Sequence, residues 1–430
     1  MVAILKHTNA LSQCNQASYL NNNGANEANY YGLTLNSHFQ PIYSLSHRRP
    51  IGYEGLLRLR DGQERSISPI DAFANVQSRP HLIELDRLSR YLHVKNFVQQ
   101  SDSKNWLFLN VHPDVLMFGK NYGAFFGELL HSAGLKPSDI VIEILEDSID
   151  DKGLLNETIQ YYRDLGCLIA IDDFGTGNSN FDRIWKIAPD IVKLDKSIIK
   201  DAKDSAVVRR MLPNLVSLIH ECGSLVLMEG IEEEEQALMA VDSGADFVQG
   251  YYLAKPAPYL VSGSSSDSLG RGGLDLSHLC SAYQGKVTRR NKNTNKVLSI
   301  YTDAFREVSS AITSGDEVAS HIDNLLSLSG VERCYMLDKK GRQIGSNYLP
   351  DEHAEVFPQR FAVLEDQCNA SWFRRAYFRR AISEPDTIHV SRPYLSMTAG
   401  IVCITLSIMV KDDNGNNVVL CCDIDWSDRD

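Results

Sequence analysis

From residue 36 to about residue 258, short apolar runs alternate with longer amphipathic segments, and this alternation restricts the possible fold most strongly. Eight runs have the length and composition of strands: HFQPIYSL, IGYEGLLRL, WLFLNV, DIVIEIL, LIAIDDF, DIVKLD, LVLMEG and FVQGYYL. Segments such as 153–165 and 204–222 have helical periodicity. Apolar strands that alternate with helices predict a parallel sheet covered by helices. Eight strands favour a TIM-type (β/α)8 barrel over 33–261. A doubly wound sheet is the alternative, but no glycine-rich phosphate loop follows any of the predicted strands.

The regions outside the predicted barrel differ from it in composition. Residues 1–32 are Asn-rich and aperiodic, which predicts a flexible tail. Residues 262–296 contain SGSSSDSLGRGG and then TRRNKNTNK, and they are interpreted as a linker. The basic cluster in this linker favours a solvated segment over a phosphate-binding role. Residues 297–430 combine an amphipathic helix over 297–312 with two hairpin patterns, one of them with Asn-Gly in its turn, so a smaller α+β domain is expected.

Charge and cysteine content restrict the environment and the partners of the chain. The formal net charge is −12, which argues against binding to long nucleic acids. The nine cysteines show no metal-binding spacing and suit a reducing compartment. The N-terminus lacks a signal-peptide pattern, and the longest apolar run near the C-terminus, GIVCITLSIMV, is too short to span a bilayer. We therefore expect a cytoplasmic protein without a membrane span.

Polar side chains occur inside or at the end of seven successive predicted strands. They are Glu54, Asn110, Glu143, the pair Asp172 and Asp173, Lys193, Glu229 and Gln249. In a (β/α)8 barrel the carboxyl ends of the strands gather at one face, where active sites are built. A single acid at a strand end is usually the N-cap of the next helix. Seven such strands in register are poorly explained by capping and predict a shared site.

The side chains in this set indicate a metal centre. The adjacent carboxylates of Asp172 and Asp173 repel each other at a buried strand end unless a cation neutralises them. Donors that are all oxygen atoms select Mg²⁺ or Mn²⁺ over zinc or copper. The number of carboxylates exceeds what one octahedral ion takes, so two ions that share Asp172 as a bridging ligand fit better. Two-metal sites of this kind cleave phosphodiesters.

The motifs around these residues resemble those of the EAL-domain phosphodiesterases. The matching motifs are FQPI (39–42), EGLLR (54–58), LNVHP (109–113), EILE (143–146), DDFGTG (172–177), KLD (193–195), EGIE (229–232) and QGYYLAKP (249–256). This resemblance covers about half of the chain. It implies Mg²⁺- or Mn²⁺-dependent hydrolysis of cyclic di-GMP to linear pGpG.

The resemblance also implies a role for each site residue. The ligands of the first metal would be Glu54, Asn110, Glu143 and Asp172. The ligands of the second would be Asp172, Asp173 and Glu229. Lys193 would orient the attacking water, and Glu232 and Gln249 would support the site. Gln40 and Arg58 would contact the nucleotide, with Arg58 suited to a phosphate or a guanine edge.

Three departures from the family pattern keep a second function open. Gly55 replaces the signature alanine, Leu145 replaces a threonine, and Asn75 with Val76 replaces the usual Ala-Glu pair. None of them removes a metal ligand. The alternative is a catalytically weak or inactive receptor that binds cyclic di-GMP to control a partner. A structural scaffold would not need polar residues at one face of the barrel.

The C-terminal region resembles PAS/Cache-type sensor modules through SWFRRAYF (371–378), RPYLSMTAGIVCITLS (392–407) and the final hairpin. Trp372, Arg374 and Tyr377 would form a small-ligand pocket, or else they pack the core and present a solvated arginine face. This resemblance implies regulation by an unidentified small-molecule or protein effector. We also expect a homodimer, with contacts from the helix over 297–312 and from this domain. A chain that ends near residue 262 should keep the metal site.

Overall fold

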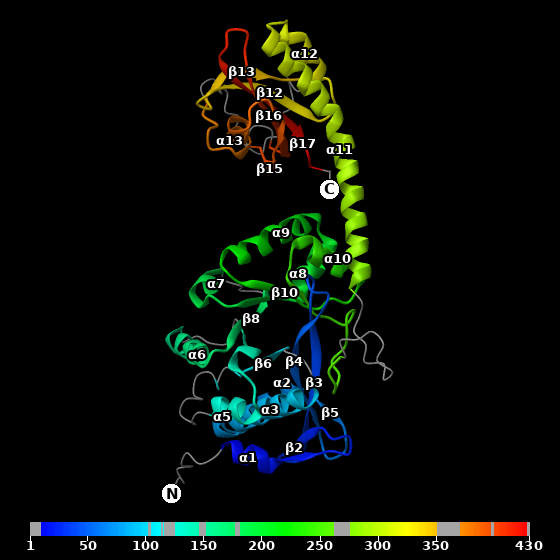
Figure 1. Ribbon diagram of the computed structural model, residues 1–430, viewed down its shortest axis with the longest axis vertical. Coiled ribbons are helices and arrows are strands. Elements are labelled where there is room, and N and C mark those ends of the chain that lie inside the picture. Colours follow the sequence, from blue (N-terminus) through cyan, green and yellow to red (C-terminus); the bar gives the residue numbers. More distant parts are fainter. Residues whose placement is uncertain are drawn as a thin grey trace. The chain divides into compact units, whose positions relative to one another are not determined.

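The computed structural model describes residues 10–101, 105–112, 115, 125–145, 152–176, 181–261, 276–350, 370–396 and 400–427 (Figure 1). The chain divides into two compact units, Met1–Gly285 and Lys286–Asp430. Every candidate site residue lies in the first unit. Among the described residues, no helix is both long and apolar enough to cross a membrane.

The first unit contains a closed barrel of eight strands, as predicted. Its strands are β3 (Leu33–Ser44), β4 (Arg49–Arg60), β6 (Trp106–Asn110), β7 (Ile140–Leu145), β8 (Leu168–Phe174), β9 (Ile191–Leu194), β10 (Leu225–Met228) and β11 (Phe247–Val248). They follow the order β3-β11-β10-β9-β8-β7-β6-β4, and the β3–β4 pairing closes the ring. The predicted apolar runs therefore correspond to the barrel strands.

One strand departs from the predicted all-parallel arrangement. β3 runs antiparallel to both of its neighbours, β4 and β11, whereas the other neighbouring strands pair in parallel. Residues 45–48 alone connect β3 to β4. A connection this short permits only an antiparallel hairpin, because a parallel pairing needs a crossover of a dozen or more residues.

Helices surround the barrel and apolar side chains fill it. The helices that follow the barrel strands include α3 (Arg79–Gln100), α5 (Phe125–Ala133), α6 (Lys152–Leu165), α7 (Phe181–Ile187), α8 (Lys196–Asp204), α9 (Ala206–Glu221) and α10 (Glu234–Ser243). The helices predicted over 153–165 and 204–222 are confirmed as α6 and α9. Seven strands contribute one buried residue each to a common cluster: Ile42, Phe108, Val141, Ala170, Ile191, Leu227 and Phe247. This cluster closes the interior of the barrel beneath the strand ends that carry the polar residues.

The prediction of a flexible tail over 1–32 is wrong for its described part. Residues 10–32 form α1 (Ala10–Ala17), β1 (Ser18–Leu20) and β2 (Asn26–Tyr30). β2 pairs antiparallel with the first residues of β3 and so extends the barrel sheet. Residues 1–9 lie outside the described part of the chain.

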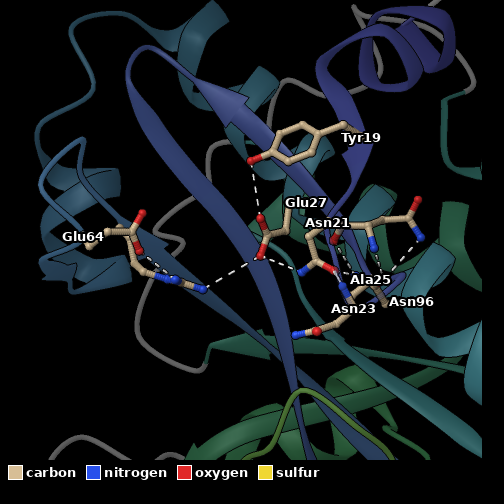
Figure 2. Close-up of polar contacts among 9 residues, drawn as sticks. Tyr19, Asn21, Asn23, Ala25, Glu27, Glu64 and Asn96 are labelled. Carbon is tan, nitrogen blue, oxygen red and sulfur yellow. Dashed lines mark hydrogen bonds and ion pairs between the residues drawn. The ribbon is translucent and has the colours of Figure 1, made fainter.

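Specific hydrogen bonds, rather than apolar periodicity, order this segment. Asn21 Nδ2 and the Tyr19 hydroxyl donate to the Glu27 carboxylate at 3.0 and 3.4 Å (Figure 2). The backbone N–H of Asn26 donates to Asn96 Oδ1 at 2.7 Å, which joins β2 to α3. Polar residues that are satisfied in this way leave no hydrophobic pattern in the sequence, so composition alone suggested disorder.

The predicted linker is also ordered over much of its length. α11 (Ser277–Ser314) begins within it and continues through the predicted helix 297–312. This helix contains no proline and a single glycine, Gly285, so nothing in its sequence interrupts the helical hydrogen bonds. Leu276 and Leu279 belong to a core cluster of the first unit. Residues 262–275 lie outside the described part of the chain.

The second unit is an antiparallel sheet between helices. Its strands are β12 (Val331–Asp338), β13 (Gln343–Tyr348), β14 (His389–Val390), β15 (Tyr394–Leu395), β16 (Val402–Lys411) and β17 (Asn417–Asp425), and its other helices are α12 (Val318–Leu326) and α13 (Ala376–Ser383). The two predicted hairpins are confirmed as β12–β13 and β16–β17. One face of the sheet packs on α11 and α12, and the other packs on α13. The α+β prediction therefore holds for this unit.

Candidate metal centre

The strands of the barrel bring the predicted metal ligands to one place. Glu54 lies on β4, Glu143 on β7, Asp172 and Asp173 on β8, and Glu229 directly after β10. The register of the parallel strands aligns these positions, for example Asn110 at the end of β6 with Glu143 on β7. The grouping predicted from the strand ends is therefore present in the fold.

Lys193 on β9 lies at the centre of this group and is only 1% exposed. Its Nζ lies 2.5 Å from Glu143 Oε1, 2.8 Å from Glu229 Oε1 and 2.9 Å from Asp172 Oδ1. Glu54 Oε1 is more distant, at 4.0 Å. Buried charges are tolerated only when they are paired, and one ammonium group here offsets part of the mutual repulsion of several carboxylates.

A local irregularity of β8 explains how two adjacent aspartates serve one site. Consecutive residues of a regular strand point to opposite faces. The pairing of β8 with β9 shifts register between Ile171 and Phe174, and Asp173 has a left-handed backbone with φ of 54°. Aspartate tolerates this conformation better than most residues. As a result, carboxylate oxygens of Asp172, Asp173 and Glu229 all lie within 4.8 Å of one another.

Neighbouring amides hold the carboxylate of Glu54 in position. Asn110 Nδ2 donates to Glu54 Oε1 at 3.1 Å, and Gln249 Nε2 donates to Glu54 Oε2 at 2.7 Å. Gln40 lies opposite Glu54 in the β3–β4 register, and its Nε2 donates to the carbonyl of Ala254 at 3.2 Å. The antiparallel β3 therefore brings Gln40 to the same site as the parallel strands.

The electrostatics of the centre reflect burial and crowding. Burial raises the pKa of Glu143 well above its usual range, although Lys193 opposes this shift. Burial likewise raises the pKa of Glu229 to about 8. Burial and the Asp172 carboxylate raise the pKa of Asp173. Burial alone would lower the pKa of Lys193, but the surrounding carboxylates outweigh it and keep that pKa well above its usual value. The metal-free centre therefore favours bound protons, which a cation would displace.

The residues present fit a divalent metal ion. Their donors are carboxylate and amide oxygens, which hard cations prefer. Glu143 Oε2 and Gln249 Oε1 are buried and have no hydrogen-bond partner among the described residues. A buried oxygen without a partner is costly, and binding of a cation by that oxygen would remove the cost. Asp172, Asp173 and Glu229 already have the spacing of a metal-binding group.

Two other predicted residues lie apart from the carboxylate cluster. Arg58 is four residues beyond Glu54 on β4, and its Nη1 donates to the Leu57 carbonyl at 2.9 Å. Strand alternation places Arg58 and Glu54 on the same face of β4. Glu232 is exposed just before α10, and its backbone N–H donates to Gln236 Oε1 at 2.7 Å. Within the described residues, no contact joins the Glu232 side chain to the cluster.

A buried pair on α3, which was not among the predicted site residues, supports the centre. Asp86 Oδ1 accepts a hydrogen bond of 3.0 Å from the backbone N–H of His112, two residues after Asn110. Asp86 Oδ2 lies 2.5 Å from Arg90 Nη2, and both side chains are about 4% exposed. The buried pair could have been predicted from one pattern in the sequence: an acid and an arginine lie four residues apart in a segment that is otherwise rich in leucine.

Two of the three residues considered for a small-ligand pocket in the C-terminal unit, Tyr377 and Arg374, lie in different environments, one in the core and one at the surface. Tyr377 is buried, and its hydroxyl lies 2.9 Å from the hydroxyl of Tyr335, so it packs the core. Arg374 is exposed. The neighbouring Arg375 instead lies over the rings of Trp372 and Tyr394, at 6.0 and 5.1 Å from their centroids. Arg375 directly precedes α13 as its N-cap residue.

Together, the fold and the cluster define an α/β-barrel protein with an acidic group of metal-ligand spacing at one face of the barrel. The EAL domain profile matches residues 32–256, which is about half of the chain. The chain therefore belongs to the EAL domain family.

Individual relatives extend this comparison. The uncharacterized EAL-domain containing protein YkuI of Bacillus subtilis is 28% identical over 353 residues, which cover 79% of this chain and 82% of YkuI. The cyclic di-GMP phosphodiesterase RocR of Pseudomonas aeruginosa is 28% identical over 229 residues, which cover 52% of this chain and 57% of RocR. The relatives named as phosphodiesterases thus match mainly through the barrel.

A solved structure shares the fold beyond the barrel. The crystal structure of the Bacillus subtilis YkuI protein, with an EAL domain, in complex with substrate c-di-GMP and calcium, matches with a TM-score of 0.72 at 23% identity. The match covers 91% of this chain and 96% of that one. The C-terminal unit therefore also has a counterpart of known fold.

Proposed function

We propose that the protein is a metal-dependent phosphodiesterase that hydrolyses cyclic di-GMP to linear pGpG. The observation that carries this proposal is the convergence of four carboxylates on Lys193, with the Asp173 carboxylate grouped beside two of them, at one face of an EAL-family barrel. RocR, a relative through the barrel, is named a cyclic di-GMP phosphodiesterase. YkuI, a relative over most of the chain, has been crystallised with c-di-GMP.

Two divalent cations suit the charge of the centre. Glu54, Glu143, Asp172, Asp173 and Glu229 with one lysine ammonium carry a formal charge of −4. Two Mg²⁺ or Mn²⁺ ions would neutralise this charge. Glu54, Asn110, Glu143 and Asp172 would hold the first ion, and Asp172, Asp173 and Glu229 would hold the second. When bound, these ions supply the positive charge that activates a water and stabilises the leaving oxygen.

The side chains of the chain would position the reactants. Lys193 contacts Glu143, Asp172 and Glu229, and these contacts would weaken if the carboxylates held cations. The ammonium of Lys193 would then have donors available to orient the attacking water. Gln249 and Asn110 keep Glu54 in place through hydrogen bonds to its two oxygens. Arg58 and Gln40, on neighbouring strands, would contact the nucleotide.

The deciding experiment is a turnover assay on the purified chain with cyclic di-GMP, in which chromatography resolves the product. We expect pGpG with Mg²⁺ or Mn²⁺. Ca²⁺ should inhibit, because its larger and looser coordination shell disturbs the bridging geometry. Binding of cyclic di-GMP without turnover in either Mg²⁺ or Mn²⁺ would instead establish the receptor alternative.

A matched pair of substitutions tests the proposed ligands. Asp172→Asn keeps the shape of the side chain but removes the charge of the bridging ligand, so turnover should fall at least a hundredfold. Asp182→Asn on α7 is the control, because this aspartate is exposed and pairs with Lys186. Equal activity in both variants would remove Asp172 from the site.

We also assign regulation to the second unit. Its separate core and its two-sided sheet support a PAS/Cache-like sensor domain that responds to a small-molecule or protein effector. Contacts through α11 and this unit would form a homodimer, and the protein would act in the cytoplasm. Light scattering tests the assembly, since a particle mass equal to one chain would exclude the dimer.

A further inference from the structure

Part of α11 is unusual in carrying positive charge without any acidic residue. Residues 276–302 contain no Asp or Glu but five Lys or Arg residues, whereas the whole chain averages one acid in about eight residues and has a net charge of −12. Most of this stretch lies within the described helix. The positive charge is therefore concentrated along one element of an acidic protein.

Four of these five cations fall on one side of the helix, here called the basic face: Lys286, Arg289, Lys292 and Lys296, all exposed. At 3.6 residues per turn these four positions lie within an arc of about 120°. Ile300, which is 59% exposed, falls in the same arc, and Val297, 37% exposed, lies at its border. The opposite side of the helix packs inward through Tyr301 and Leu298.

The cations of the basic face have no ion-pair partner within the described part of the chain, whereas several other exposed cations do. Lys186 pairs with Asp182, Lys203 with Glu233, and Arg306 with Asp303. By contrast, the four side chains of the basic face form no ion pair with any described residue. Their charge is therefore available to an external anionic partner.

We propose that the basic face docks on anionic phospholipid headgroups at a membrane surface. Clusters of four or more cations on one side of an amphipathic helix are attracted to anionic lipids. Exposed aliphatic side chains beside the cations, here Ile300 and Val297, insert at the boundary between headgroups and acyl chains. Single-stranded RNA fits less well, because it is held by aromatic stacking and residues 286–300 contain no aromatic side chain.

The test is co-sedimentation of the full chain with vesicles of phosphatidylcholine that contain 30% phosphatidylglycerol or none. We expect binding only to the anionic vesicles at 50 mM NaCl, and loss of binding at 500 mM. Each cation removed should weaken binding about fivefold. The combined variant Lys286→Gln, Arg289→Gln, Lys292→Gln and Lys296→Gln should therefore bind at least a hundredfold more weakly. Ile300→Ser should weaken binding with little change in its salt dependence.

A control variant removes the same amount of charge at cations that are already paired: Lys186→Gln, Lys203→Gln, Arg306→Gln and Arg342→Gln. It should bind vesicles as the native chain does. Three outcomes overturn the proposal: no binding of the native chain to anionic vesicles, equal loss in the two variants, or tighter binding to single-stranded RNA than to vesicles. The salt dependence of the native chain decides the matter even if a variant fails to fold.

Discussion

Lys193 brings one ammonium group into contact with three carboxylates, of which those of Glu143 and Asp172 are buried and that of Glu229 is partly buried. Lys193→Met removes this charge at nearly constant shape and leaves the carboxylates unpaired. Breaking a buried charge network by removing one partner costs about 3 kcal/mol or more. We therefore expect the metal-free variant to unfold at a lower temperature than the native chain, and Mn²⁺ to restore more stability to the variant. Its turnover should fall even when metal is bound. Calorimetry with and without Mn²⁺ measures the stability effect.

The matched control is Lys203→Met, because Lys203 is partly exposed and pairs with Glu233 on the surface. Surface pairs contribute at most about 1 kcal/mol. An equal loss of stability in both variants would show that Lys193 does not balance the charge of the centre.

Burial of His93 on α3 predicts how the free energy of unfolding changes at acidic pH. Burial, with a smaller contribution from Arg58, lowers the pKa of His93 to about 3. The unfolded chain binds a proton at this histidine below about pH 6.5, but the folded chain does not. The free energy of unfolding should therefore fall by about 1.4 kcal/mol per pH unit between pH 6.5 and pH 3, and this residue should contribute no slope above pH 6.5. Urea titrations of His93→Gln should show a flatter pH dependence from pH 6.5 to 5.0. Parallel curves for variant and native chain would contradict the assignment.

Single residues also show what the sequence could reveal. A carboxylate at the end of an apolar strand is visible in the sequence, and so Glu143 and Asp172 were identified in this way. The left-handed backbone of Asp173 was not visible, because it depends on the register shift between β8 and β9. The support from Asp86 depends on where α3 packs, which no local pattern specifies.

At the scale of elements, the packing of β4 on α3 accounts for the glycine at position 55. A methyl group at Gly55 would lie 2.9 Å from Cγ of His93, too close for van der Waals contact. The imidazole cannot easily move, because its nitrogens lie 2.8 Å from Ser37 Oγ and 3.1 Å from Ser89 Oγ. This glycine therefore compensates for a large neighbour and leaves Glu54 in place on β4.

The packing predicts an energetic coupling between the two elements. Gly55→Ala should lower the free energy of unfolding by about 2 kcal/mol through overpacking. Adding His93→Ala makes room for the methyl group, so the double variant should be more stable than the sum of the two single losses indicates. Urea unfolding of the four proteins measures the coupling. Additive losses would mean that the two side chains do not compete for space.

The elements themselves were largely predictable, but their connections were less so. The barrel strands from β4 to β11 can be identified from the sequence, because each is an apolar run and helical segments lie between the runs. This pattern is local and does not depend on tertiary contacts. The antiparallel direction of β3 follows from the short connection at 45–48. The prediction of a parallel barrel rested on the number of strands and not on the length of this connection. The first part of α11 was interpreted as a linker because its composition is polar. The lack of helix-breaking residues there indicates a helix instead.

At the scale of the whole molecule, the two units do not divide where the composition changes. The first unit extends to Gly285, and Leu276 and Leu279 at the start of α11 are 0% and 1% exposed within its core. A chain that ends at residue 285 should therefore stay soluble and keep its metal-dependent stabilisation. A chain that ends at residue 262 lacks both leucines and should unfold at a lower temperature. Each leucine that is no longer buried lowers the free energy of unfolding by about 2 kcal/mol. Thermal unfolding of both truncations decides this, and equal midpoints would contradict it.

The pairing of β2 with β3 extends the barrel sheet beyond the start of the family match. The family match begins at residue 32, yet β2 (Asn26–Tyr30) covers the first residues of β3. A chain cut at the start of that match would present unpaired backbone donors and acceptors along the edge of β3, which other chains could join by strand addition. The family match is thus shorter than the sheet to which its first strand belongs, and the asparagine-rich segment that precedes the match covers this edge of β3.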